Sequence, residues 1–369
     1  MISLKQYIKN PSVGYVVKIF NNDNELTYVI GNKSVLPKVI PTTLDTLYDI
    51  ASLTKTYTAV LVYMAYEEKL LDIYDTVYNV DNNFKNLKDV RIIDLLSHNQ
   101  EIWTDGYLGN SKTKEEFYKI LYSSSVKSKI PTYVDAHYII LSTILENIYN
   151  TDFKNLVNEK IIKKLNLKNT TFDPDENKTA SNNYEYTNGK IIDNIYPGVI
   201  HDTKARVAKQ LGITTGHASI FTTCDDLLTF LKTFFDYSLL KKETIDLMLQ
   251  HNDINLSNYN ILKQYYNKSD INEMYEDAIS KNPDLYLPKT YNNMGTRYRN
   301  DINILNDVPT KASSNSISFS GYTGPMFTID FERKIIVVIM CNVIHNTRLN
   351  RIERKNKVVD IMNYIFKKL

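Results

Sequence analysis

The chain has 369 residues, of which 43% are hydrophobic and 23% charged, the composition of a globular protein that can bury a sizeable core. Its 44 basic and 42 acidic residues leave a formal charge of +2, so no global field would attract nucleic acid or an anionic membrane surface. With only Cys224 and Cys341, no disulfide framework and no closely spaced metal-ligand pair can be proposed, and we expect two buried thiols, although one bridge between them is not excluded.

The beginning of the chain shows no targeting segment. MISLKQYIKNPSVGYVV has no long apolar run after its lysines and no small-residue cleavage site, so no secretory signal is visible. No stretch is long and apolar enough to cross a bilayer. We therefore expect a cytoplasmic protein by default, or a cell-envelope or secreted protein if an export signal was trimmed from the sequence.

The first elements in chain order are two strands and a helix. Residues 13–20 and 25–31 are apolar runs joined by the turn-prone Asn-Asn-Asp-Asn, which predicts a β-hairpin. Residues 52–70 carry apolar side chains at helical spacing and predict a buried helix with Ser52 near its start, as a plausible cap.

The rest of the chain is first helical and then returns to strands. Residues 91–170 show apolar side chains three and four apart, and 225–237 predicts one more helix, whereas 251–293 is polar and weakly periodic. Residues 325–331 and 334–343 predict two strands before a closing helix. Because both ends of the chain supply strands, we expect an α+β fold with one antiparallel sheet flanked by helices. We divide this domain into a sheet-containing part, residues 1–68 plus 225–369, and a mostly helical inserted part, residues 69–224.

The predicted helix at 52–70 opens with Ser52-Leu53-Thr54-Lys55, a Ser-x-x-Lys pattern. Residues three apart lie on one face of a helix, so the Lys55 amine can approach the Ser52 hydroxyl. A serine hydroxyl is a weak nucleophile and needs such a partner to be activated. As a bare pattern, Ser-x-x-Lys also fits a helix cap and a surface lysine, and the surrounding segments decide between the two.

Five segments in the same order resemble serine beta-lactamase-related proteins, the family of class C beta-lactamases, penicillin-binding proteins and esterase-like serine hydrolases. These segments are DTLYDIASLTKTYTA, RIIDLLSHNQEI, the block from PTYVDAHY to NTTF, the block from VIHDTKAR to LLTFL, and SFSGYTGPMFTIDFERKIIVVIMCNVIH. The resemblance implies a beta-lactamase/transpeptidase-like fold, Ser52 as nucleophile, and Lys55 and Tyr133 as the groups that move its proton. It leaves open whether Lys55 or Tyr133 is the general base. It implies no cofactor and no metal.

Two positions depart from the family pattern. Asp135 stands where the family usually has Asn, and its negative charge can pair with Lys55 and move the role of base towards Tyr133. The third motif, usually Lys or His followed by Thr or Ser and Gly, aligns with Phe319-Ser320-Gly321. Because Phe319 is no cation, we expect substrates that are recognised by a free carboxylate to be less favoured. The backbone N–H groups of Ser52 and Tyr322 are expected to form the oxyanion hole.

Three alternatives were weighed against this interpretation. A Ser-His-Asp triad would use His201-Asp202 or His98, but adjacent residues rarely pair with each other, and we expect structural histidines, with His137 packed in the helical layer. A metal site lacks clustered ligands at short spacing. A penicillin-binding fold that has lost turnover and serves as a binding or regulatory module is favoured by Asp135 and Phe319.

The resemblance therefore predicts a serine hydrolase that forms an acyl-enzyme with a D-amino-acid peptide or a small ester. Its expected partner is a small-molecule or peptide substrate, with no nucleic acid. The sequence leaves the oligomeric state open.

Overall fold

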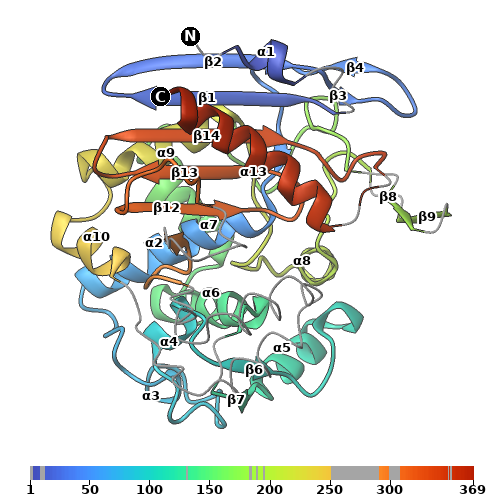
Figure 1. The fold of residues 1–369 in the computed structure, drawn as a ribbon. Coiled ribbons are helices and arrows are strands. Elements are labelled where there is room, and N and C mark those ends of the chain that lie inside the picture. Colours follow the sequence, from blue (N-terminus) through green and yellow to red (C-terminus); the bar gives the residue numbers. More distant parts are fainter. Residues whose placement is uncertain are drawn as a thin grey trace, which may run out of the picture.

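The computed structural model describes residues 3–8, 13–129, 132–182, 185–187, 190–193, 196–250, 291–298, 308–347, 349 and 351–369. Its centre is a six-stranded antiparallel sheet with the strand order β11-β12-β13-β14-β1-β2 (Figure 1). The strands are β1 (Tyr15–Asn21), β2 (Asn24–Ile30), β11 (Arg297–Tyr298), β12 (Ser316–Ser320), β13 (Met326–Asp330) and β14 (Ile335–Cys341). The predicted sheet from both ends of the chain is confirmed, because β1 pairs with β14, with Tyr15 opposite Cys341.

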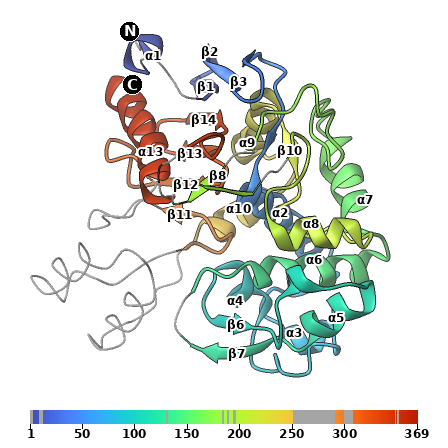
Figure 2. The same cartoon turned by 90° about the vertical axis from the view of Figure 1, so that its right-hand side faces the viewer.

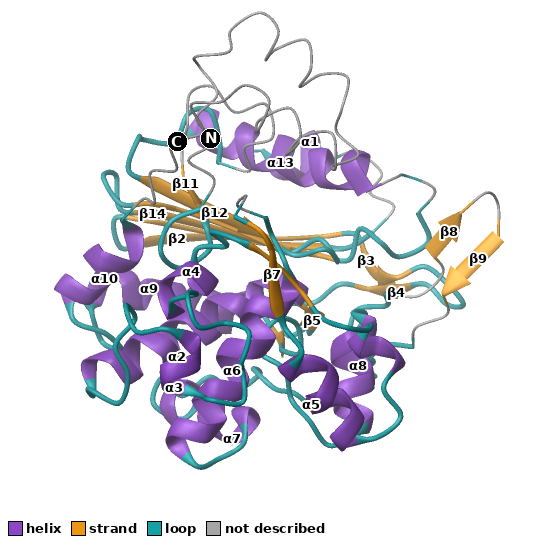
Figure 3. Cartoon of the chain, turned by 90° about the horizontal axis from the view of Figure 1, so that it is seen from below, coloured by secondary structure: helices purple, strands orange, loops and turns teal. Residues whose placement is uncertain are grey.

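The sheet is covered on both faces, and this explains why all seven residues of β14 are buried. Side chains alternate across a strand, so Val337 and Ile339 pack in one core with α13 (Arg351–Lys368). Ile336 and Val338 pack in the other core with α2 (Thr54–Glu67) and α9 (Cys224–Asp236). Figure 3 shows α13 on one face of the sheet and α2 and α9 on the opposite face. The strand β12, which carries the third motif, lies towards the edge formed by β11.

A helical part lies below the sheet in the views of Figures 1 and 2. Besides α13, the α-helices of the described residues are α1 (Leu4–Tyr7), α2 (Thr54–Glu67), α3 (Val77–Val80), α4 (Ile92–Leu96), α5 (Lys114–Tyr122), α6 (Asp135–Tyr149), α7 (Phe153–Val157), α8 (Thr203–Gln210), α9 (Cys224–Asp236) and α10 (Lys242–Leu249). The predicted helices at 52–70, within 91–170 and at 225–237 are confirmed. One continuous apolar core joins this part to the sheet, and the boundaries at 68/69 and 224/225 stay a prediction.

Short two-stranded sheets decorate this frame. They are β3 (Asn32–Ser34) with β4 (Ile40–Pro41), β5 (Tyr48–Asp49) with β10 (Phe221–Thr222), β6 (Glu101–Trp103) with β7 (Ser125–Ser128), and β8 (Glu185–Thr187) with β9 (Lys190–Asp193). Cys224 and Cys341 are buried free thiols, as expected. Across the described residues, every helix is too short or too polar to span a bilayer. Of the weakly periodic stretch 251–293, residues 251–290 lie outside the described residues.

Candidate active site

Ser52 lies on a strained turn in front of α2. Ala51–Leu53 form a 3-10 turn that leads into α2, and Ala51 has a φ of +44°, in the left-handed region that residues with a side chain rarely adopt. The buried carboxylate of Asp49 holds the turn, because it accepts hydrogen bonds from the backbone N–H groups of Ala51 and His201, both at 2.8 Å. Ser52 does not cap the helix, since the N-cap position is Leu53. The turn instead places Ser52 on the wall of a pocket.

Lys55 is buried beneath Ser52, with only 1% of its surface exposed. Its ammonium group donates to the Ser52 hydroxyl at 3.2 Å, to Asp135 Oδ1 at 2.9 Å and to the carbonyl oxygen of His217 at 3.1 Å. Burial acts to lower the pKa of Lys55, but Asp135 and Tyr133 outweigh it and raise this pKa above its ordinary value. An ammonium has three N–H donors, so all three are used in the resting site. Lys55 is therefore a positioned cation at rest.

Tyr133 lies over the same ammonium, with 4.9 Å between Lys55 Nζ and the centre of its ring. Burial raises the pKa of Tyr133, and Asp135 raises it further, whereas Lys55 and hydrogen bonding to Ser52 lower it. The net result is a pKa above the ordinary value of tyrosine, although Lys55 acts to lower it. The cause is the buried position together with the nearby carboxylate. Both candidate bases consequently hold their protons at rest.

Two buried histidines pack behind Tyr133. The Nδ1 atoms of His98 and His137 are 2.7 Å apart, and the His98 ring centre is 4.5 Å from that of Tyr133. Burial holds the pKa of His98 well below its usual value and lowers that of His137 to about 3, so both rings are neutral near pH 7. The expected packing of His137 is confirmed. The pair fixes the back of the tyrosine ring.

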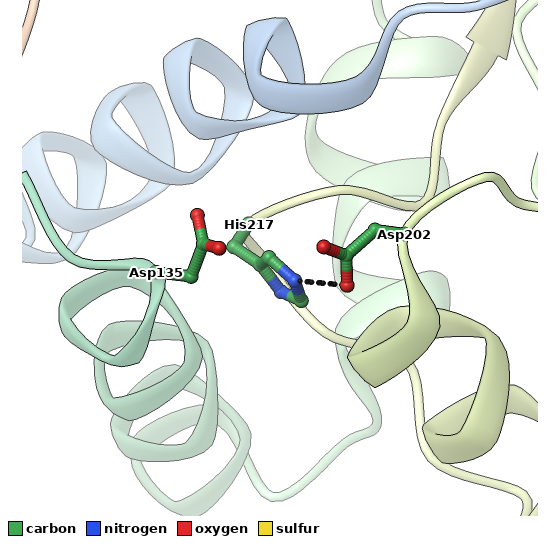
Figure 4. Close-up of side chains that lie close together, drawn as sticks. All are labelled: Asp135, Asp202 and His217. Carbon is green, nitrogen blue, oxygen red and sulfur yellow. Dashed lines mark hydrogen bonds and ion pairs between the residues drawn. The ribbon is translucent and has the colours of Figure 1, made fainter. Parts of the chain in front are cut away.

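Asp135 begins α6 and is held from two sides. Its Oδ1 pairs with Lys55 at 2.9 Å, and its Oδ2 pairs with Lys204 at 3.0 Å. Lys204 also pairs with Asp202 at 3.2 Å, and Asp202 Oδ1 lies 2.9 Å from His217 Nε2 (Figure 4). Burial alone would raise the pKa of Asp135, but Lys55, His217 and Lys204 hold it well below its ordinary value. The predicted Lys55–Asp135 pair is thus present, inside a larger network that includes Lys204.

Asp135, Asp202 and His217 bring one potential ligand atom each to within 4.8 Å of one another. Each carboxylate is already paired with an amine, and the two ammonium groups of Lys55 and Lys204 face the same carboxylate. A further cation would meet like charges at this place. We therefore assign these side chains to an ion-pair network and identify no metal ligand among them.

The third motif reaches the pocket at the end of β12. Phe319 is 4% exposed, stands opposite Phe327 in the register with β13, and lines the pocket next to Ser320. A Cβ atom on Gly321 would lie 2.6 Å from the backbone oxygen of Ile50, so only glycine lets β12 approach the turn before Ser52. Thr323 points away from the pocket, because its hydroxyl donates to the backbone oxygen of Asp49 at 2.7 Å. This arrangement fits the alignment with Phe319-Ser320-Gly321.

Ser52 and Tyr322 line the same pocket, and the oxyanion hole formed by their backbone N–H groups stays a prediction. The Tyr322 ring stacks on His201 with 5.1 Å between ring centres. Its hydroxyl accepts from Arg354 Nη2 at 3.1 Å. Tyr322 therefore connects the motif strand to α13.

The pocket has a volume of about 500 Å³ and contains cations that do not come from the third motif. Arg351, Arg354 and Lys355 reach it from α13, and Arg297 reaches it from β11. The acidic residues on its wall, Asp135 and Asp202, are already paired with lysines. Phe319 supplies no cation at the third motif, and the effect of this on substrate choice stays a prediction. Positive charge reaches the pocket from α13 and β11.

The histidines considered for a Ser-His-Asp triad make other contacts in the structure. Asp202 pairs with the ring of His217, not with that of its neighbour His201, and it also caps α8 by accepting from Ala205 N–H. The ring of His98 is engaged with His137. The Ser52 hydroxyl receives its hydrogen bond from Lys55. Asp49, Lys204 and His217 are residues that sequence reasoning missed, because their contacts join segments that are far apart in the chain. Asp49 contacts His201, Lys204 contacts Asp135, and His217 contacts Lys55.

Comparison with known proteins gives one consistent result. A family model described as Beta-lactamase matches residues 10–359. A protein of Salmonella typhi described as a "Putative D-alanyl-D-alanine carboxypeptidase" is 25% identical over 350 residues, covering 86% of this chain and 74% of the relative. Two solved structures share the fold. The D-amino acid amidase of Ochrobactrum anthropi SV3 has a TM-score of 0.66 at 13% identity, covering 99% of this chain and 97% of the other. EstCE1, a hydrolase with promiscuous acyltransferase activity, has a TM-score of 0.69 at 18% identity, covering 96% of each chain.

Proposed function

The chain belongs to the beta-lactamase family, and from this premise we propose that it is a serine hydrolase that forms an acyl-enzyme on Ser52 with an ester or amide substrate. The observation that carries the proposal is the hydrogen bond of 3.2 Å between the buried Lys55 ammonium and the Ser52 hydroxyl. A serine whose hydroxyl contacts a buried amine on the wall of a pocket has the arrangement of an activated nucleophile.

The proposed reaction has two halves. In the first, Tyr133 or Lys55 loses its own proton to solvent and then takes the proton of Ser52 while Ser52 Oγ bonds to the carbonyl carbon. The bond from that carbon to the alcohol or amine then breaks, and the departing group takes the proton from the same base. In the second, water adds to the acyl-enzyme, gives up a proton to the same base and releases the acid, and Ser52 recovers its proton. Because both candidate bases hold their protons at rest, acylation should accelerate as pH rises.

Reagents that acylate or phosphonylate serine test this proposal directly. Incubation with a fluorophosphonate or a fluorescent penicillin, followed by intact-mass measurement, is expected to show one adduct per chain. A panel of p-nitrophenyl esters, D-amino-acid amides and a chromogenic cephalosporin then identifies the substrate class. If no reagent forms an adduct and no substrate turns over, the competing function is favoured, which is a binding or regulatory module on this fold. The departures from the family pattern at Asp135 and Phe319 support that competing function.

The cations of α13 favour acyl donors that carry a negative charge. We expect Arg351→Ala to raise the KM for p-nitrophenyl hemisuccinate about fivefold while changing the KM for the neutral p-nitrophenyl butyrate less than twofold, since a half-exposed charge contact contributes about 1 kcal/mol. Lys357→Ala is the matched control, because Lys357 lies on the same helix, is exposed, and is absent from the pocket wall. Equal effects on both esters would show that Arg351 does not recognise charge.

A further inference from the structure

Asp135 is bound by two lysines that come from different helices. Lys55 on α2 contacts Oδ1 at 2.9 Å, and Lys204 on α8 contacts Oδ2 at 3.0 Å. Lys204 is itself mostly buried, with 19% of its side chain exposed, and it is anchored by Asp202, the N-cap of its own helix, at 3.2 Å. Each oxygen of the carboxylate therefore has its own cation, which fixes the plane of the carboxylate as well as its position.

We propose that Lys204 is a positioning residue for acyl transfer, which holds Asp135 on Lys55 and sets the pH at which the site can remove the proton of Ser52. This inference rests on the proposed function. Asp135 and Lys204 form one compensating unit: an amide at position 135 would leave the two ammonium groups facing each other, and a neutral residue at 204 would leave the carboxylate to Lys55 alone.

The sign of the effect follows from the charges around the site. Lys55 from α2 and Lys204 from α8 contact Asp135, and Asp202, the N-cap of α8, contacts Lys204. His217 from the segment before β10 lies against Asp202, and the Lys204 ammonium lies over the Tyr107 ring. Tyr138 lies beside the Lys55 ammonium, Tyr291 and His98 of the neutral His98–His137 pair lie against the Tyr133 ring, and Arg297 from β11 lies over the Tyr291 ring. Removing the Lys204 cation favours retention of a proton on Tyr133 and on Lys55 alike. Removing the Asp135 anion favours loss of a proton from either group. The prediction is therefore the same whichever of the two is the base.

The experiment measures the rate of acylation by p-nitrophenyl butyrate in the first turnover from pH 5 to pH 10. Lys204→Met is expected to move the rising limb to higher pH by roughly one unit, which makes acylation about tenfold slower at pH 7. Asp135→Asn is expected to move the limb to lower pH by a similar amount. The double variant is expected to return the rising limb to within about 0.3 pH units of its wild-type position. Lys204→Arg keeps the cation and should leave the limb at its wild-type position.

The controls separate this inference from a merely structural role and from the proposed function. Lys209→Met removes a lysine from the same helix that pairs with Asp173 at 2.8 Å, away from the pocket, and should leave the limb unmoved. A loss of rate in Lys204→Met that the double variant does not restore, or shifts of the same sign in the two single variants, would overturn the inference. Absence of acylation in the wild type would instead speak against the proposed function. Urea unfolding of the wild type, the two single variants and the double variant then tests the pairing of Lys204 with Asp135. If the two substitutions are coupled by less than about threefold in the unfolding equilibrium constant, the pairing is overturned.

Discussion

Replacing Ser52 with alanine is expected to abolish covalent labelling and to slow the turnover of any ester or amide substrate by roughly 10⁴-fold or more. The substitution removes the hydroxyl alone. A water molecule that took its place would not be fixed beside the substrate carbonyl carbon as the covalently attached Ser52 oxygen is, so the rate falls. The fold should survive, because Lys55 keeps Asp135 and the His217 carbonyl as partners. Intact-mass measurement after fluorophosphonate treatment and steady-state kinetics give the two readings, and urea unfolding should place the variant within about 1 kcal/mol of the wild type.

Ser320→Ala is the matched control for this experiment. Ser320 lies on the wall of the same pocket at the end of β12, so it is accessible to the same reagents. We expect its variant to bind substrates less well and still to form the adduct. An adduct that persists on Ser52→Ala, or that disappears on Ser320→Ala alone, would show that the nucleophile has been misassigned.

The sequence predicted the parts of the fold that rest on periodicity. The continuous apolar run in β14 and the apolar helix at α2 have patterns that a core imposes, and both lie within a few residues of the predicted positions. The pairing of β6 with β7 was missed, because Ser125–Ser128 is polar and half-exposed and has no buried face to impose a pattern. Local patterns thus report local burial.

The site divides along the same line. Ser52 and Lys55 are three residues apart, so their contact follows from helical geometry. Lys204 reaches Asp135 only because α8 and α6 pack together, and no pattern in either segment encodes that contact. Ala51 was missed because its positive φ is imposed by Asp49 and the neighbouring backbone, not by its own side chain. The cations that α13 brings to the pocket were not predicted, because the third motif lies on a different element and neither segment encodes their proximity.

Lys55→Met and Lys55→Arg are expected to have different consequences, and the difference identifies the base. Lys55→Met removes the cation that contacts Ser52 and should slow acylation by roughly 10³-fold or more. It should also lower the free energy of unfolding by about 1–3 kcal/mol, because the His217 carbonyl loses its donor and Asp135 keeps only Lys204. Tyr133→Phe should slow acylation as much as Lys55→Met does, with a smaller effect on stability.

Lys55→Arg keeps a cation on Asp135 but supplies a group that does not lose its proton. The three N–H donors of Lys55 are engaged by Ser52, Asp135 and the His217 carbonyl, and this favours transfer of the Ser52 proton to Tyr133. We therefore expect Lys55→Arg to acylate at least tenfold faster than Lys55→Met, with a rising limb in its pH profile that Tyr133→Phe lacks. If Lys55→Arg is as slow as Lys55→Met while it unfolds at the same urea concentration as the wild type, the neutral amine of Lys55 is the base, and Tyr133 serves to position it.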